Sequence, residues 1–279
     1  MLGQRVVTAI VLLALLLPAL FAASPWPFAV LTLVLIGAAG WEWGRLNQAG
    51  AASIAMGLAL ALACAAAWWA GWTRAAPPAA WWLACGLWVL GGAFALRAGP
   101  AGWPRLPAAL RQAGGLLLLW AAWLALASAK TIGLNFILSV FCLVWVADIA
   151  AYFGGRAFGR RKLALAISPG KSWEGAWTGM AATVLLAFAW LRVDHAFAVD
   201  SASLYARIDA RLGPFGLVLV VLFLASMSIV GDLFESLVKR AVGAKDSSQL
   251  LPGHGGVLDR VDALLPVFPI ALALASLSP

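Results

Sequence analysis

Charged side chains and glycines are concentrated between Gly231 and Asp262, in the segment GDLFESLVKRAVGAKDSSQLLPGHGGVLDRVD. This segment contains five of the eleven acidic residues of the chain, which are Asp232, Glu235, Asp246, Asp259 and Asp262. It also contains four cations and one of the two histidines, namely Lys239, Arg240, Lys245, Arg260 and His254. Carboxylates beside cations in an otherwise apolar chain predict a polar site, and metal-dependent phosphate chemistry at a membrane surface is the hypothesis that they favour.

The spacing of these carboxylates predicts where they lie. If the helix before Gly231 continues past it, Asp232, either Glu235 or Ser236, and Lys239 recur every three or four residues and share one face. Asp232 then ends one apolar segment and Asp259 begins the next, which places their oxygens at the same depth. Oxygen-only ligation suits Mg²⁺, which binds one or two carboxylates and completes its shell with phosphate and water. We therefore predict Asp232 and Asp259 as Mg²⁺ ligands, with Asp246 and Asp262 as secondary candidates.

The loop between these two helices contains Gly255 and Gly256, preceded by His254. Adjacent glycines permit a positive φ and a close approach of backbone amides to an anion. His254 has no second histidine or cysteine at ligand spacing, so we expect it to donate a hydrogen bond to phosphate or carboxylate and not to bind zinc. The absence of a GxSxG motif disfavours a serine hydrolase.

A second polar region covers residues 145–175. Asp148 lies inside an apolar segment, where a carboxylate is costly unless it faces protein, water or a cation. Two interpretations of Asp148 stay open: it is a functional carboxylate, or it is a structural partner of Arg156. We expect Gly154 and Gly155 to break the helix. The basic residues that follow are typical of a cytoplasmic loop, and they would also attract an anionic lipid.

The sequence SPGKSWEG closes this second region. Ser168, Pro169 and Gly170 predict a turn ahead of a helix that begins near Ser172. Lys171 would then lie at a helix N-terminus, where a phosphate can bind.

The composition sets the class of protein that must position these residues. Of the 279 residues, 64 % are hydrophobic and 11 % charged, and the mean hydropathy is +0.95. These values predict an all-α polytopic membrane protein folded as one bundle. The net charge of +8 is typical of basic cytoplasmic loops, so nucleic acid is not an expected partner. The three cysteines lack CxxC spacing and predict packing residues.

Nine apolar segments are long enough to be candidate spans. They cover residues 6–22, 27–44, 52–71, 79–97, 113–130, 134–153, 175–191, 214–231 and 261–277. The first also resembles a cleavable signal peptide, although another apolar segment follows at once. Thirteen of the nineteen lysines and arginines lie in loops after even-numbered spans, which predicts that these loops are cytoplasmic; we expect the N-terminus outside.

This topology divides the chain into two parts. Residues 1–112 are predicted to be a scaffold of about four spans, with Glu42 an interfacial carboxylate. Residues 113–279 are predicted to be a catalytic region with cytoplasmic loops at 154–174 and 232–260.

The polar residues resemble a known signature. Residues 236–262 match S-x-x-K-R-x(4)-K-D…P-x-H-G-G-x-x-D-R-x-D of the phosphatidate cytidylyltransferase (CDP-diacylglycerol synthase) family. The segments AYFGGRAFGR and ISPGKSWEG resemble a second region of that family. One departure is Ile149-Ala150, where the family commonly has Thr-Gly.

The resemblance implies an enzyme of phospholipid biosynthesis. It would transfer CMP from CTP to phosphatidate and release pyrophosphate, with Mg²⁺ and often K⁺, as a homodimer among the lipids of the bacterial inner membrane and with its active site facing the cytoplasm. The expected catalytic residues are Asp232, Asp259, Lys239, Arg240, Lys245, His254 and Arg260. The expected substrate-binding residues are Asp148, Arg156, Ser168, Lys171, Trp173, Glu174, Ser236, Asp246, Gly255, Gly256 and Asp262.

Two alternatives stay open on the residues alone. Intramembrane carboxylates such as Asp148 also mark ion pathways in transporters, but here the acids gather at one predicted boundary and the halves show no repeat. The second alternative is a related enzyme that transfers the nucleotide to a different lipid acceptor.

Overall fold

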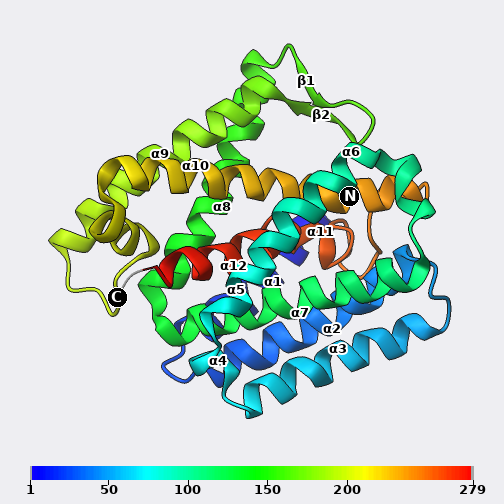
Figure 1. The fold of residues 1–279 in the computed structure, drawn as a ribbon, viewed down its shortest axis with the longest axis horizontal. Helices are drawn as coiled ribbons and strands as arrows, with labels where there is room; N and C mark the ends of the chain where they lie inside the picture. Colours follow the sequence, from blue (N-terminus) through cyan, green and yellow to red (C-terminus); the bar gives the residue numbers. More distant parts are fainter. Residues whose placement is uncertain (1, 278–279) are drawn as a thin grey trace.

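The computed structural model describes residues 2–277, with side chains from residue 6, and the chain folds as a helical bundle (Figure 1). Seven helical segments have the length and apolarity to cross a membrane. They are α2 (Trp26–Leu46), α3 (Ala52–Trp69), the composite Pro78–Arg105, α7 (Ala108–Ile132), α8 (Leu134–Phe158), α9 (Trp173–Ala196) and α10 (Leu204–Ala241). Two shorter apolar helices, α1 (Leu2–Phe21) and α12 (Leu264–Ala275), occupy the first and last predicted spans. The all-α polytopic class is confirmed, while nine crossings remain a prediction.

Small residues bring α2 and α3 together along one side of the bundle (Figure 1). A Cβ added at Gly57 of α3 would lie 2.5 Å from the carbonyl oxygen of Gly37 on α2. Close backbone approach of this kind is how membrane helices gain packing contacts without a hydrophobic driving force. α7 packs against both helices.

The long apolar segment Pro78–Arg105 is a composite of short pieces. After α4 (Trp72–Ala75), the chain forms α5 (Pro78–Gly86), a π-helical turn at Leu87–Gly91, α6 (Gly92–Gly102) and a 3₁₀ turn at Trp103–Arg105. Gly99 has φ +67° directly before Pro100, and this pair bends the segment, because proline cannot continue the helical hydrogen-bond ladder.

The α8–α9 pair carries a β-hairpin made of β1 (Lys162–Ala164) and β2 (Ser168–Ser172). The hairpin projects beyond the helices at the top of Figure 1. Two predictions are wrong here. Ser168–Gly170 belongs to a strand and not to a turn, because the hairpin turn falls at 165–167. The helix also runs through Gly154 and Gly155 to Phe158.

Those glycines serve helix packing. A Cβ at Gly154 would lie 2.3 Å from the Thr178 hydroxyl of α9, and one at Gly179 would lie 2.7 Å from the carbonyl oxygen of Ala147 on α8. The glycines therefore let α8 and α9 touch backbone to backbone. The predicted start of the following helix is confirmed, since Ser172 caps α9 by accepting a hydrogen bond from the Gly175 amide at 3.2 Å.

α10 continues past Gly231 to Ala241, which meets the condition under which the sequence places Asp232, Ser236 and Lys239 on one helix face. Near its start, Gly213 with φ +68° and Pro214 form a kink. After the loop, α11 (Leu258–Val261) and a turn lead into α12, so the last helix begins at Leu264 and not at 261. Gly231 packs against this turn, where an added Cβ would lie 2.4 Å from the Asp262 carbonyl oxygen.

The start of α1 lies beside the loop that connects α10 to α11. The Thr8 hydroxyl donates a hydrogen bond to the Pro252 carbonyl oxygen at 2.9 Å. The N-terminal end of α1 is therefore on the same face as the 232–260 loop. The prediction of an N-terminus on the opposite side from this loop is wrong, because the Thr8 contact joins the start of α1 to the loop.

Candidate active site

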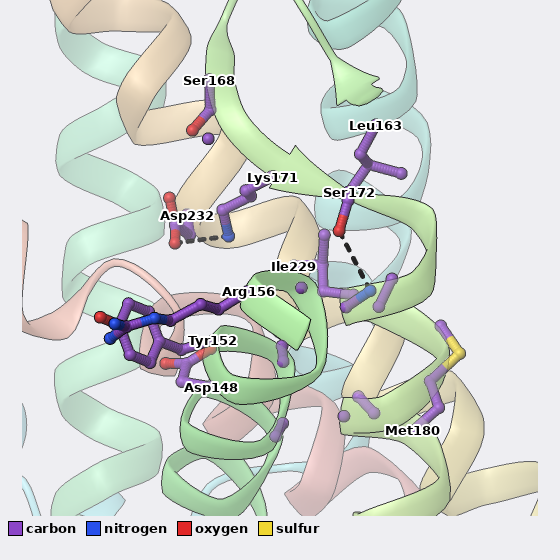
Figure 2. A pocket seen from close by; sticks show the side chains of 18 residues that line it. Asp148, Tyr152, Arg156, Leu163, Ser168, Lys171, Ser172, Met180, Ile229 and Asp232 are labelled. Carbon is purple, nitrogen blue, oxygen red and sulfur yellow. Dashed lines mark hydrogen bonds and ion pairs between the residues drawn. The ribbon is translucent and has the colours of Figure 1, made fainter. Parts of the chain in front are cut away.

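A cavity of about 600 Å³ opens between α8, α9, α10 and the β-hairpin (Figure 2). Its polar lining includes five predicted site residues, which are Asp148, Arg156, Ser168, Lys171 and Asp232. They come from a helix, a strand and a second helix that lie far apart in the sequence. The fold thus joins the two polar regions of the sequence in one site.

An ion pair joins these regions at the cavity. Lys171 on β2 reaches across to α10, where its Nζ lies 2.6 Å from an Asp232 carboxylate oxygen (Figure 2). Both side chains keep about a quarter of their surface exposed, 25 % and 29 %. The Ser236 hydroxyl, one helical turn further along α10, donates to the same carboxylate at 3.4 Å. Lys171 therefore has a carboxylate partner beside the N-terminus of α9, where a phosphate was predicted.

Asp148 lies on the α8 wall of the cavity, one and two turns before Tyr152 and Arg156 (Figure 2). It shares the cavity lining with Lys171 and Asp232. Within the described part of the chain, no ion pair joins Asp148 to Arg156, so the structural interpretation of Asp148 lacks the contact it needs.

The carboxylates around Lys171 suit a hard cation. Asp148 and Asp232 line one cavity, whereas the Asp262 carboxylate accepts the Ala263 amide at 2.8 Å. No group of three or more His, Cys, Asp or Glu side chains in the described residues forms a metal site by itself. Two carboxylates are nevertheless sufficient for Mg²⁺ when substrate phosphates and water complete the shell. The chemistry of the donors therefore fits Mg²⁺ bound together with a nucleotide.

A second cluster lies where α10 ends and α11 begins. Lys239 Nζ contacts Glu235 and Asp259, each at 2.5 Å. Asp259 also accepts hydrogen bonds from the Ser247 amide and hydroxyl, both at 2.8 Å, and from the Gly256 amide at 2.7 Å. Burial acts to raise the pKa of Asp259, but these hydrogen bonds outweigh it and lower the pKa below its ordinary value.

The glycines of the loop lie against carboxylates of the chain itself. Gly255 has φ +82°, and a Cβ there would lie 2.7 Å from Asp259 Oδ2. The close approach predicted for a substrate anion is thus made to Asp259. Asp259 does not line the cavity that contains Asp232, and its role as a metal ligand remains a prediction.

Glu42 of α2 is fully buried in this second cluster, contrary to its predicted interfacial position. Its carboxylate accepts hydrogen bonds from two serine hydroxyls and two backbone amides of the loop, contributed by Ser247, Ser248, Val257 and Leu258. The N-terminal part of the chain therefore contributes a side chain to this cluster. A signal was present in the sequence, because Glu42 is the sole acidic residue before Asp148.

The remaining predicted residues surround these two clusters. Arg240 donates to the Ala244 carbonyl at 3.0 Å, and Arg260 donates to the His254 carbonyl at 2.6 Å. Lys245 and Asp246 are exposed in the loop. His254 Nδ1 is buried, and among the described atoms it has no hydrogen-bond partner.

Glu174 and Trp173 begin α9 at the edge of the cavity. The Glu174 carboxylate accepts the backbone amides of Arg160 at 3.0 Å and Arg161 at 3.2 Å, and so it fixes the basic loop before β1. Trp173 is exposed and stacks on Trp177 with 6.3 Å between ring centroids. The basic loop before β1 is therefore held by α9.

Comparisons with known proteins agree with this geometry. A model of the cytidylyltransferase family matches residues 3–278. The phosphatidate cytidylyltransferase of Pseudomonas aeruginosa is 38 % identical over 98 % of this chain and 97 % of its own length. The proteins of the same name from Haemophilus influenzae and Brucella melitensis are 46 % and 48 % identical over 49 % and 48 % of this chain, and over 44 % of their own lengths. The chain belongs to the cytidylyltransferase family.

Proposed function

We propose that the protein transfers CMP from CTP to phosphatidate, giving CDP-diacylglycerol and pyrophosphate at the cytoplasmic surface of the bacterial inner membrane. The similarity to the Pseudomonas aeruginosa protein extends along nearly the whole chain, so the named activity of that relative is the natural candidate. The observation that carries the proposal is the pairing of Lys171 with Asp232 beside Asp148 in one cavity.

The chemistry of this transfer requires little from a general base. The phosphate of phosphatidate is ionised near neutral pH, so the attacking oxygen already carries charge. The enzyme must neutralise two anions that repel each other and align them for in-line displacement at the α-phosphorus. Lys171 and Arg156 supply positive charge at the cavity for the lipid phosphate. Lys239, Arg240, Lys245 and Arg260 supply it on the loop side for the nucleotide and pyrophosphate.

Mg²⁺ is the proposed cofactor, and it would neutralise charge on the nucleotide phosphates. Asp232 is its first proposed ligand, with Asp259 as the predicted partner and Asp148 as the carboxylate that shares the cavity. Ser236 hydrogen-bonds to Asp232 and thereby orients its carboxylate. K⁺ as a second cation and a homodimer are further proposals from the family resemblance.

A direct assay tests the proposal. Purified protein in detergent receives labelled CTP, Mg²⁺ and phosphatidate, and the products are resolved as CDP-diacylglycerol and pyrophosphate. EDTA should abolish turnover. Product formation with another acidic lipid and none with phosphatidate would overturn the proposed acceptor.

Asp232→Asn tests the carboxylate that carries the site. We expect turnover to fall by at least about a thousandfold, because the amide keeps the shape but loses the charge that binds the cation and pairs with Lys171. The unfolding temperature in detergent should change little. Asp209→Asn, on the far side of the bundle, is the matched control and should retain full activity. Normal turnover by the Asp232 variant would refute its assignment as a metal ligand.

A further inference from the structure

Glu42 is a buried carboxylate whose partners among the described residues are all donors from one loop. Oε1 accepts the Ser248 hydroxyl at 2.5 Å and the Val257 amide at 2.9 Å. Oε2 accepts the Ser247 hydroxyl at 3.1 Å and the Leu258 amide at 2.8 Å. Two of these donors are backbone amides at the start of α11, so the carboxylate acts as an N-terminal cap supplied by a distant helix.

The same donors connect Glu42 to Asp259. The Ser247 hydroxyl lies between the two carboxylates, 2.8 Å from Asp259 Oδ2. The intervening Gly256 gives its amide to Asp259, and a Cβ at that position would lie 2.2 Å from Glu42 Oε1. The loop backbone is thus confined between one carboxylate from α2 and one from α11.

α2 is a firm support for this contact. The ring of Trp43, next to Glu42, stacks on Phe234 of α10 with 6.0 Å between centroids, and its Nε1 donates to the Arg111 carbonyl at 3.1 Å. Packing of the neighbouring residue against two other helices fixes the position of the Glu42 backbone. The carboxylate can therefore fix the position of the loop groups that donate to it.

We propose that Glu42 is a positioning residue for the proposed transfer reaction: it holds the 246–258 loop so that Asp259 and His254 keep the geometry needed to bind CTP. The inference rests on the proposed function for its kinetic part. Its structural part, that Glu42 orders the loop, stands on the hydrogen bonds alone.

Glu42→Gln is the informative substitution because it preserves size and removes charge. Both Glu42 oxygens accept a backbone amide, from Val257 and Leu258, so the amide nitrogen of glutamine must face one N–H with another. We expect kcat/KM for CTP to fall about tenfold or more, with KM for phosphatidate within about twofold of wild type. Amide hydrogen exchange at Val257 and Leu258 should accelerate.

Asn47→Ala supplies the matched control. Asn47 is equally buried and caps the C-terminus of the same helix, and its side chain accepts hydrogen bonds from Trp103 at 3.0 Å and from Arg111 of α7 at 3.4 Å. The Asn47→Ala variant should have a lower unfolding temperature, while its kcat/KM for CTP should stay within about twofold of the wild-type value. A general loss of stability would affect both variants alike.

Ser248→Ala completes a double-mutant cycle. Because Ser248 binds Glu42 directly, the double variant should be no worse than Glu42→Gln alone. Wild-type kinetics in Glu42→Gln, equal activity loss in Asn47→Ala, or unchanged exchange at Val257 and Leu258 would each overturn the inference. Wild-type protein without turnover on CTP and phosphatidate would instead refute the proposed function, and the exchange measurement would still test the ordering of the loop.

Discussion

Lys239 shows how one side chain can be essential to the fold and also belong to the site. Its ammonium lies between the buried carboxylates of Glu235 and Asp259, at 2.5 Å from each. Removing one partner of a buried charge cluster leaves the others uncompensated, which is more costly than never having formed the cluster.

Lys239→Met should therefore unfold the protein more readily. We expect a loss of about 3–5 kcal/mol, the cost typical of breaking a buried ion pair, measured as a lower midpoint of thermal unfolding in detergent. Lys245→Met is the control, since Lys245 is exposed in the same region, and it should leave stability unchanged. A Lys239 variant as stable as wild type would show that Glu235 and Asp259 do not need this cation.

At the scale of elements, the contact between α8 and α9 sets the distance between two helices that line the cavity. A Cβ at Gly179 would lie 2.7 Å from the Ala147 carbonyl, a backbone atom that cannot rotate away. Gly179→Ala should separate the two helices and lower both unfolding temperature and turnover.

Gly114→Ala is the matched control for that substitution. Gly114 lies in α7 with no atom within 4 Å of an added Cβ, so alanine there should be neutral or stabilise by about 0.5–1 kcal/mol. If both variants behave alike, close packing of α8 and α9 is not what Gly179 provides.

Asp200 also stabilises α8, because its side chain caps the N-terminus of that helix. Its carboxylate accepts the amides of Leu134 at 2.5 Å and Asn135 at 2.9 Å. Burial acts to raise the pKa of Asp200, but these hydrogen bonds outweigh it and lower the pKa below its ordinary value.

A lowered folded-state pKa means that the cap stabilises the protein above the ordinary aspartate pKa and is lost as the pH falls through the folded value. Asp200→Ala should cost about 1 kcal/mol at pH 7. The difference in unfolding temperature between wild type and variant should narrow as the pH is lowered from 5 towards 3. A difference independent of pH would show that the charge of Asp200 does not stabilise α8.

The sequence predicted those elements whose determinants are local. Apolar length located the long helices, whereas the continuation of α10 past Gly231 was only a condition under which Asp232, Ser236 and Lys239 would share one face, and the structure meets that condition. Gly154 and Gly155 were misread because a glycine that permits close packing and one that ends a helix look identical until the partner helix is known. Glu42 could not be placed, because its partners lie more than 200 residues away.

At the scale of the whole molecule, the two predicted parts of the chain are joined through the site. α12 packs against α5 and α7 as well as α10, and Glu42 from α2 enters the loop between α10 and α11. A division at residue 112 remains a prediction, but the first part is more than a scaffold in one respect, since it holds the loop that contains Asp259.

The contact between Thr8 and Pro252 makes a prediction about topology. It places the start of α1 on the face of the 232–260 loop, and the surplus of lysine and arginine in the loops after even-numbered spans predicts that this face is cytoplasmic. A Lys245→Cys variant in intact cells should resist a thiol reagent that cannot cross the inner membrane, whereas Asp209→Cys should react. The opposite labelling would invert the proposed topology.

The last helix decides whether the chain crosses nine times. α12 has 12 residues and a length of about 18 Å, short of the roughly 30 Å hydrocarbon core. It runs from α11 towards the end of the molecule where α9 joins α10 (Figure 1), so together with α11 and the intervening turn it can complete the crossing. A C-terminal alkaline phosphatase fusion should then be active, because that enzyme folds only outside the cytoplasm, while an N-terminal green fluorescent protein fusion should be fluorescent. An inactive C-terminal fusion beside a fluorescent N-terminal one would mean an even number of crossings, with α12 held inside the bundle as packing against α5 and α7.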